Sequence, residues 1–120
     1  MKIFKQFLAN GSESKTDQFW VDAAGKPWPI YVKRLAIPAL ANAGSIAVAH
    51  VVPTIKLNGH FKCASLEVSN AGNTLRCGLN DIRLTSVVLT DATNIGVTNT
   101  ADLTLYVNGS MVIEYCKTTD

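Results

Sequence analysis

The two histidines, His50 and His60, are the side chains best suited to proton transfer or metal binding near neutral pH. His50 lies in the apolar segment SIAVAHVVP, where a histidine is more often a hydrogen-bonded core residue than a catalytic base. His60 follows the turn-forming pair Asn58–Gly59 and is expected at the end of a loop. No Asp, Glu or Cys accompanies the two histidines in a metal-binding motif. We therefore expect no metal site and no catalytic histidine.

Other catalytic arrangements lack a local signature in this chain. Nucleophilic catalysis needs a Ser or Cys, a His and an orienting acid, and these residue types occur without a recognisable motif. Most acidic residues stand in turn-like segments, where Asp serves as a turn former. A carboxylate pair for glycoside cleavage would have to come from Glu67, Asp81, Asp91, Asp102 and Glu114. We expect no enzyme, no catalytic residue and no cofactor.

The three cysteines are Cys63, Cys77 and Cys116. An odd number of cysteines without a Cys-x-x-Cys motif does not form a disulfide framework. A free cysteine usually behaves as a small buried hydrophobic residue. We expect all three to be reduced thiols that fill the core, which suits assembly in a cytoplasm.

Two tryptophans, Trp20 and Trp28, flank the segment VDAAGKP. Exposed aromatic rings beside a glycine turn can stack on sugar rings. Aromatic side chains are also enriched in the cores of subunit interfaces. The sequence leaves a sugar-binding role and a structural role open for these two residues.

The overall charge argues against nucleic acids and membranes as partners. Lys and Arg total 11, Asp and Glu total 9, and the net charge is +2 without any basic cluster. The chain has no run of about 18 apolar residues that could span a membrane, and its first residues do not read as a secretory signal. Only 17% of residues are charged, against about 25% in a typical globular chain. We therefore expect part of its apolar surface to meet another chain.

From Phe19 onward the pattern predicts an all-β fold. Short alternating segments such as IYVKRL are separated by turn signals about every ten residues, as in antiparallel sandwiches. The segment SIAVAHVVP is apolar on both faces and is expected to form an interior strand, closely packed at Ala47 and Ala49. Asn58–Gly59 is a hairpin signal. We predict an antiparallel, jelly-roll-like β-sandwich over residues 19–120.

The segment LTLYVNGSMVIEY predicts a terminal hairpin with a two-residue turn at Asn108–Gly109. Opposed residues of such a hairpin share a face, and both faces would be apolar. One face, with Leu103, Leu105, Val107 and Val112, could contact the core. The other is expected at a subunit interface or under the N-terminal segment, and carries Tyr106, Met111, Ile113 and Tyr115.

Residues 1–18 differ from the rest of the chain. The segment KIFKQFLAN has apolar residues at helical spacing, and SESKTDQ behind it is expected to be a polar linker. A helix of nine residues is marginal alone and needs a surface to lie against. We predict a helical or extended arm over residues 1–18 that attaches the protein to a larger particle through Ile3, Phe4, Phe7 and Leu8.

Several segments together resemble the C-terminal head module of phage and prophage tail-fibre and receptor-binding proteins. These segments are FWVDAAGKPWPIYVKRLAIPAL, SIAVAH, TNIGVTNTADL and the ending VIEYCKTTD. The chain departs from the family pattern by the inserted pairs Ala23–Ala24 and Trp28–Pro29 and by Cys116 in place of a threonine. The matching positions are Trp20, Asp22, Gly25, Lys26, Pro27, Tyr31, Lys33, Ala49, His50, Glu114, Tyr115, Lys117, Thr118, Thr119 and Asp120.

The resemblance implies a homotrimeric all-β head on a virion, assembled in the cytoplasm of a bacterial host. It implies a structural protein whose exposed loops contact a host-surface glycan or another receptor, and it names no ligand-binding residue. An alternative is a purely architectural head- or tail-decoration protein that binds only other virion proteins. A glycan-degrading enzyme fits least, because no acid pair stands out.

Overall fold

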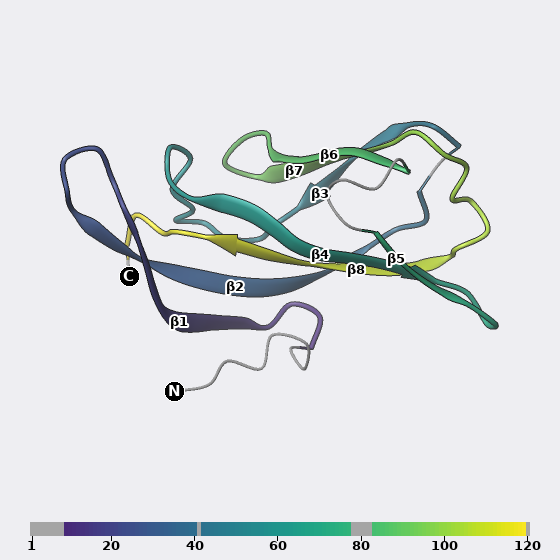
Figure 1. Cartoon of the computed structure of the whole chain (residues 1–120), viewed down its shortest axis with the longest axis horizontal. Helices are drawn as coiled ribbons and strands as arrows, with labels where there is room; N and C mark the ends of the chain where they lie inside the picture. Colours follow the sequence, from purple (N-terminus) through teal and green to yellow (C-terminus); the bar gives the residue numbers. More distant parts are fainter. Residues whose placement is uncertain (1–8, 41, 78–82, 120) are drawn as a thin grey trace.

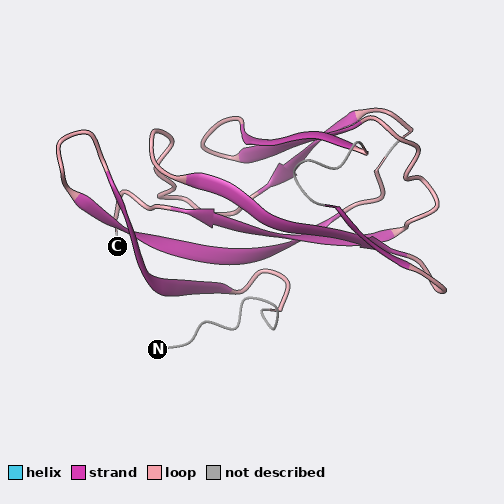
Figure 2. Ribbon diagram, viewed as in Figure 1, coloured by secondary structure: helices cyan, strands magenta, loops and turns pink. Residues whose placement is uncertain are grey.

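The computed structural model describes residues 9–40, 42–77 and 83–119. All regular elements within these ranges are strands, arranged in two layers (Figure 1; Figure 2). They are β1 (Glu13–Val21), β2 (Pro27–Ile37), β3 (Ser45–Ala49), β4 (Phe61–Ser69), β5 (Thr74–Cys77), β6 (Leu84–Leu89), β7 (Asn94–Asn99) and β8 (Asn108–Tyr115).

The strands form two antiparallel sheets. One sheet has five strands in the order β1-β2-β8-β4-β5, and the other has three in the order β3-β7-β6. Every pair of neighbouring strands is antiparallel. The predicted all-β antiparallel class is confirmed, and the two layers form a β-sandwich-like fold.

Strand alternation places one core between the two sheets. In β7 the buried residues Ile95, Val97 and Asn99 alternate with less buried ones, as expected for a strand with one covered face. Met111, Ile113 and Tyr115 of β8 face the same core from the five-stranded sheet. The core also takes in residues of β2, β3, β4 and the connecting loops, including Leu35, Ile37, Leu40, Val48, Val52, Ile55, Cys63, Leu66, Val68 and Leu103.

The predicted terminal hairpin is wrong. Asn108 and Gly109 begin β8, which lies between β2 and β4, and the residues before them form a loop. Gly109 pairs with both Ile37 and Val68. A Cβ atom on Gly109 would lie 2.7 Å from Ile37 Cγ1, so this glycine serves close packing between strands. The Asn-Gly signal reflected that packing requirement, not a turn.

The residues expected at a subunit interface lie in the core of a single chain. Met111, Ile113 and Tyr115 are completely buried there, and Tyr106 packs against the same cluster. Without the hairpin, the face that was expected to contact a neighbour points at the three-stranded sheet. Met111, Ile113 and Tyr115 therefore have no exposed surface to offer to a neighbouring chain, whereas Tyr106 remains partly exposed.

The expected polar linker SESKTDQ is instead the start of β1, which begins at Glu13 and pairs with β2. The predicted domain boundary between residues 18 and 19 thus falls inside a strand. β1 is an edge strand whose first residues are polar and whose surface is mostly exposed. The proposed attachment residues Ile3, Phe4, Phe7 and Leu8 lie outside the described residues.

The segment expected to be an interior strand is also placed differently. β3 is at the edge of the three-stranded sheet and pairs only with β7 within the described parts of the chain. Ala47 and Ala49 are exposed, whereas Val48 on the opposite face is buried. The alanine face therefore has little covering surface, and the small side chains do not mark close packing.

Candidate functional site

A cluster of polar and aromatic side chains joins β1, β2 and the end of β8. The rings of Tyr31 and Tyr115 stack with centroids 6.2 Å apart and planes 15° from parallel. The Tyr115 hydroxyl donates a hydrogen bond to the Glu13 carboxylate. Lys117 Nζ lies 3.1 Å from the other Glu13 oxygen and 4.7 Å from the centroid of the Tyr31 ring. We call Glu13, Tyr31, Tyr115 and Lys117 the tyrosine cluster.

The tyrosine cluster is built for stability rather than proton transfer. Burial raises the pKa of Tyr115, and its hydrogen bond to Glu13 and the charge of that carboxylate raise it further. The hydroxyl therefore stays protonated and acts as a donor. Its proton is already directed at Glu13, so it is not presented to a substrate.

Lys33 extends this arrangement toward the three-stranded sheet. Its side chain is buried, and Nζ donates to the carbonyls of His50 and Val51 at 2.9 Å each. Burial lowers the pKa of Lys33, the Glu13 charge raises it, and the Lys117 charge lowers it. Both bonds fix the loop that follows β3.

The loop after β3 contains a strained residue. Val51 has φ of 55°, which a β-branched residue rarely adopts, and its side chain is 72% exposed. Such a conformation costs on the order of 1–3 kcal/mol and persists only where neighbouring contacts hold it. The two hydrogen bonds from Lys33 are contacts of this kind. They hold the carbonyl before Val51, which belongs to His50, and the carbonyl of Val51 itself.

His50 is a hydrogen-bonded core histidine, as predicted. It is 1% exposed, and its Nδ1 accepts a hydrogen bond from the Val52 amide at 3.1 Å. Because Nδ1 is an acceptor, the proton of the neutral ring lies on Nε2, which is 3.3 Å from the Asp91 carbonyl. Nδ1 thus bonds within the loop after β3, and Nε2 links this loop to the β6–β7 turn.

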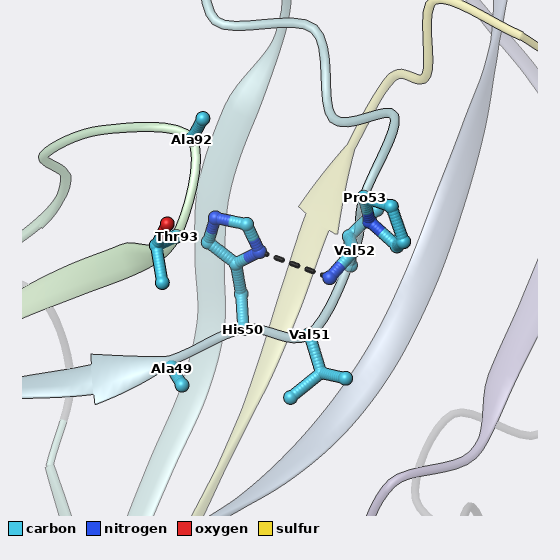
Figure 3. Close-up of a pocket in the computed structure, with 7 residues that line it drawn as sticks. All are labelled: Ala49, His50, Val51, Val52, Pro53, Ala92 and Thr93. Atoms are coloured by element: carbon cyan, nitrogen blue, oxygen red, sulfur yellow. Dashed lines mark hydrogen bonds between the residues drawn. The ribbon is translucent and has the colours of Figure 1, made fainter.

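A shallow hollow lies at this junction and has a volume of about 320 Å³ (Figure 3). In Figure 3 the His50 ring lies between Thr93 on one side and Val52 and Pro53 on the other. Most of the lining is apolar, and its residues are Ala49, His50, Val51, Val52, Pro53, Ala92 and Thr93. The hollow offers few polar groups with which to orient a ligand.

A second arrangement surrounds Trp28, which is half-buried on β2. Its indole Nε1 donates to Asp22 Oδ2 at 2.9 Å. Lys26 Nζ and Lys56 Nζ each lie 4.3 Å from the centroid of the Trp28 ring. We call Asp22, Lys26, Trp28 and Lys56 the Trp28 site. Trp20 is the β1 partner of Trp28 in the strand register.

The carboxylates that could have formed a catalytic pair serve other purposes. Asp91 and Asp102 accept hydrogen bonds within their own turns, and these bonds lower the pKa of each. Glu67 pairs with Arg76 at 3.0 Å on the surface, and Glu114 lies 3.3 Å from His60 Nε2. Asp81 lies outside the described residues.

Two of the three cysteines are buried free thiols, as predicted. Burial raises the pKa of Cys63 to about 11 and also raises that of Cys116. The side chain of Cys77 lies outside what the structure describes. Thiols with a raised pKa carry little thiolate at neutral pH and are poor nucleophiles.

The described residues show neither a metal-binding cluster nor a membrane-spanning helix. Over the described ranges, no three His, Cys, Asp or Glu residues group closely enough to hold a metal ion. Within the same ranges, no helix has the length and apolar character needed to cross a membrane. No protein family model, no curated protein and no solved structure matches this chain.

Proposed function

We propose that the chain is a phage virion structural protein, a small fibre or spike head that contacts a host-surface receptor such as a glycan. The proposal rests on contacts between the segments that resemble phage receptor-binding heads. Tyr31 of the opening segment stacks on Tyr115 of the ending, and Lys33 of the opening binds the carbonyl of His50 in the middle segment. Lys117 of the ending lies over the Tyr31 ring.

This convergence supports a shared framework. The three segments are far apart in the sequence, so chance similarity in each would not require them to meet. Their matching side chains hold one another in place, which suits a common scaffold that carries variable loops. A non-enzymatic role agrees with this, because Lys33, His50 and Tyr115 are each committed to structural hydrogen bonds.

We also propose that the sandwich has jelly-roll connections and assembles as a homotrimer. The low charged fraction of 17% supports an additional buried surface. Several large apolar side chains remain exposed on one chain, among them Leu105 at 77% and Val107 at 62%. These two residues lie in the loop before β8 and are better placed for a subunit contact than the buried face of β8. Sedimentation equilibrium showing a stable monomer would contradict the trimer.

The function can be tested on particles from the phage or prophage that encodes the chain. Antibodies raised against the purified protein, carrying gold, should label the tail tip in electron micrographs. The purified protein should also reduce adsorption of those particles to host cells. Unlabelled particles would contradict a virion role. Labelled heads without any effect on adsorption would favour an architectural decoration protein over receptor binding.

A further inference from the structure

We propose that the Trp28 site binds an acidic saccharide, meaning a sugar ring that carries a carboxylate or a phosphate. The inference rests on the proposed receptor-binding function and names the class of ligand. An indole ring offers a flat apolar surface to the C–H face of a sugar once the two ammonium groups that lie over it turn toward an anion.

The indole is held in place by a structured turn. Asp22 Oδ1 accepts hydrogen bonds from the amides of Ala24 and Lys26 at 2.9 Å each, while Oδ2 accepts the bond from Trp28 Nε1. The hydrogen bond from Trp28 is the largest cause that lowers the pKa of Asp22, and the amide bond from Lys26 is the second. Three hydrogen bonds thus use the carboxylate to orient the ring and the turn.

Lys56 reaches the same ring from a distant segment. Its amide donates to the carbonyl of Cys116 at 2.9 Å, and its carbonyl accepts from the amide of Gly59. A Cβ atom on Gly59 would lie 3.1 Å from Lys56 Cδ, so the lysine stem packs against this glycine. The packed stem aims the ammonium group at Trp28.

The two ammonium groups are available to a ligand. Within the described residues, neither Lys26 Nζ nor Lys56 Nζ makes a hydrogen bond or a salt bridge, and both interact with the ring of Trp28. With Asp22 counted, the site carries a net charge of +1. An anionic group that draws the lysine side chains off the ring would replace weak cation–π contacts with charge-assisted hydrogen bonds and would uncover the indole for the sugar.

The chemistry favours an acidic sugar over a nucleic acid. Nucleic-acid binding draws on many phosphate contacts along a basic stripe, and this chain has a net charge of only +2 without such a stripe. A single indole with two cations fits one charged ring. Asp22 and Lys26 of the site match the family pattern, whereas Trp28 is one of the inserted residues, so the aromatic ring of the site is particular to this chain.

The test measures binding to defined oligosaccharides by tryptophan fluorescence. The chain has two tryptophans, so Trp20→Phe is made in every variant and Trp28 becomes the only indole reporter. The probes are tetragalacturonate, a phosphorylated mannose oligomer and neutral tetragalactose. We expect at least one acidic probe to change the Trp28 emission and the neutral probe to leave it unchanged. The stronger of the two acids identifies the anion.

Lys26→Gln and Lys56→Gln should each weaken acid binding roughly tenfold or more, which is the range of a charge-assisted hydrogen bond. The matched control is Lys62→Gln, which removes an exposed lysine from β4 and should leave binding unchanged. All four proteins should share one unfolding midpoint. Equal binding of the neutral probe, no response to either acid at millimolar concentration, or unchanged binding in both lysine variants would overturn the inference.

These outcomes are separate from those that test the virion role. If antibodies label particles while the acidic probes fail to bind, the ligand class is wrong and the proposed function stands. If the probes bind a protein that is absent from particles, the site is real and the proposed function is wrong.

Discussion

Replacing Gly109 by Ala tests the close packing between β8 and its neighbours. The new Cβ would lie 2.7 Å from Ile37 Cγ1, 3.1 Å from Ile37 Cδ1 and 3.2 Å from the Glu67 carbonyl oxygen. Ile37 is buried in the core and the carbonyl belongs to the backbone of β4, so the methyl group has contacts on two sides. Overpacking of this kind costs about 1–3 kcal/mol.

Chemical denaturation followed by tryptophan fluorescence would measure the loss. We expect the free energy of unfolding to fall by about 1–3 kcal/mol, with an unchanged dependence on denaturant. Gly72→Ala is the matched control, because a Cβ atom there meets nothing within 4 Å. That substitution should leave stability unchanged or raise it by a few tenths of a kcal/mol, because alanine restricts the unfolded chain.

A double-mutant cycle identifies the cause of the loss. Ile37→Ala removes Cγ1 and Cδ1, so Gly109→Ala should cost at least about 1 kcal/mol less in that background than in the wild-type chain. A requirement for glycine in a turn would instead give the same cost in both backgrounds. Equal costs, or a Gly109→Ala protein as stable as the wild type, would refute the packing account.

Three further predictions concern the loop after β3 and the buried thiol of Cys63. Val51→Gly should raise the free energy of unfolding by up to about 1 kcal/mol in thermal or chemical melts, because it relieves a φ of 55° at an exposed side chain; a loss of stability would contradict this. Lys33→Met should lower the free energy of unfolding by about 1–3 kcal/mol, because the carbonyls of His50 and Val51 lose their hydrogen-bond donor. Proteolysis after residue 50 should also become faster, and an unchanged melt would contradict the anchoring role of Lys33. The pKa of Cys63 is raised to about 11, so the unfolded chain releases the thiol proton first and stability should fall between about pH 9 and 11. Cys63→Ala should reduce that slope, and an identical slope in the variant would contradict the buried thiol.

Local patterns predicted the class of fold and several buried residues. Alternation in the IYVKRL segment of β2, together with frequent turn signals, was sufficient for an antiparallel β protein. The apolar neighbours of His50 were sufficient to place it in the core with its ring satisfied. The first inference depends on the alternation along a strand, and the second on the residues next to His50 in the sequence. Both features can be seen in a short segment of sequence.

The errors have a different physical origin. Asn108–Gly109 is a good turn sequence, yet the same glycine is needed where Ile37 approaches the backbone, and only tertiary structure distinguishes these uses. The first residues of β1 are polar and mostly exposed, so SESKTDQ reads as a linker. Edge position depends on which strands pair, and pairing over long separations leaves no local signal.

The Trp28 site shows the same limit in the candidate site. The sequence singled out Trp28 and its glycine turn but gave no reason to join Lys56 to them. That lysine arrives because the chain after β8 binds the turn before β4: the Thr118 amide donates to the Thr54 carbonyl at 2.7 Å, and Ile55 pairs with Lys117.

The same segment connects the framework to the Trp28 site. Lys117 belongs to the tyrosine cluster. The carbonyl of its neighbour Cys116 accepts a hydrogen bond from the Lys56 amide, and the Cys116 sulfur lies 3.9 Å from the Trp28 carbonyl oxygen. The chain after β8 therefore contacts both the tyrosine cluster and the Trp28 site. A structural cluster joined in this way to a charged aromatic site at the surface is an arrangement in which ligand preference can change without loss of the fold.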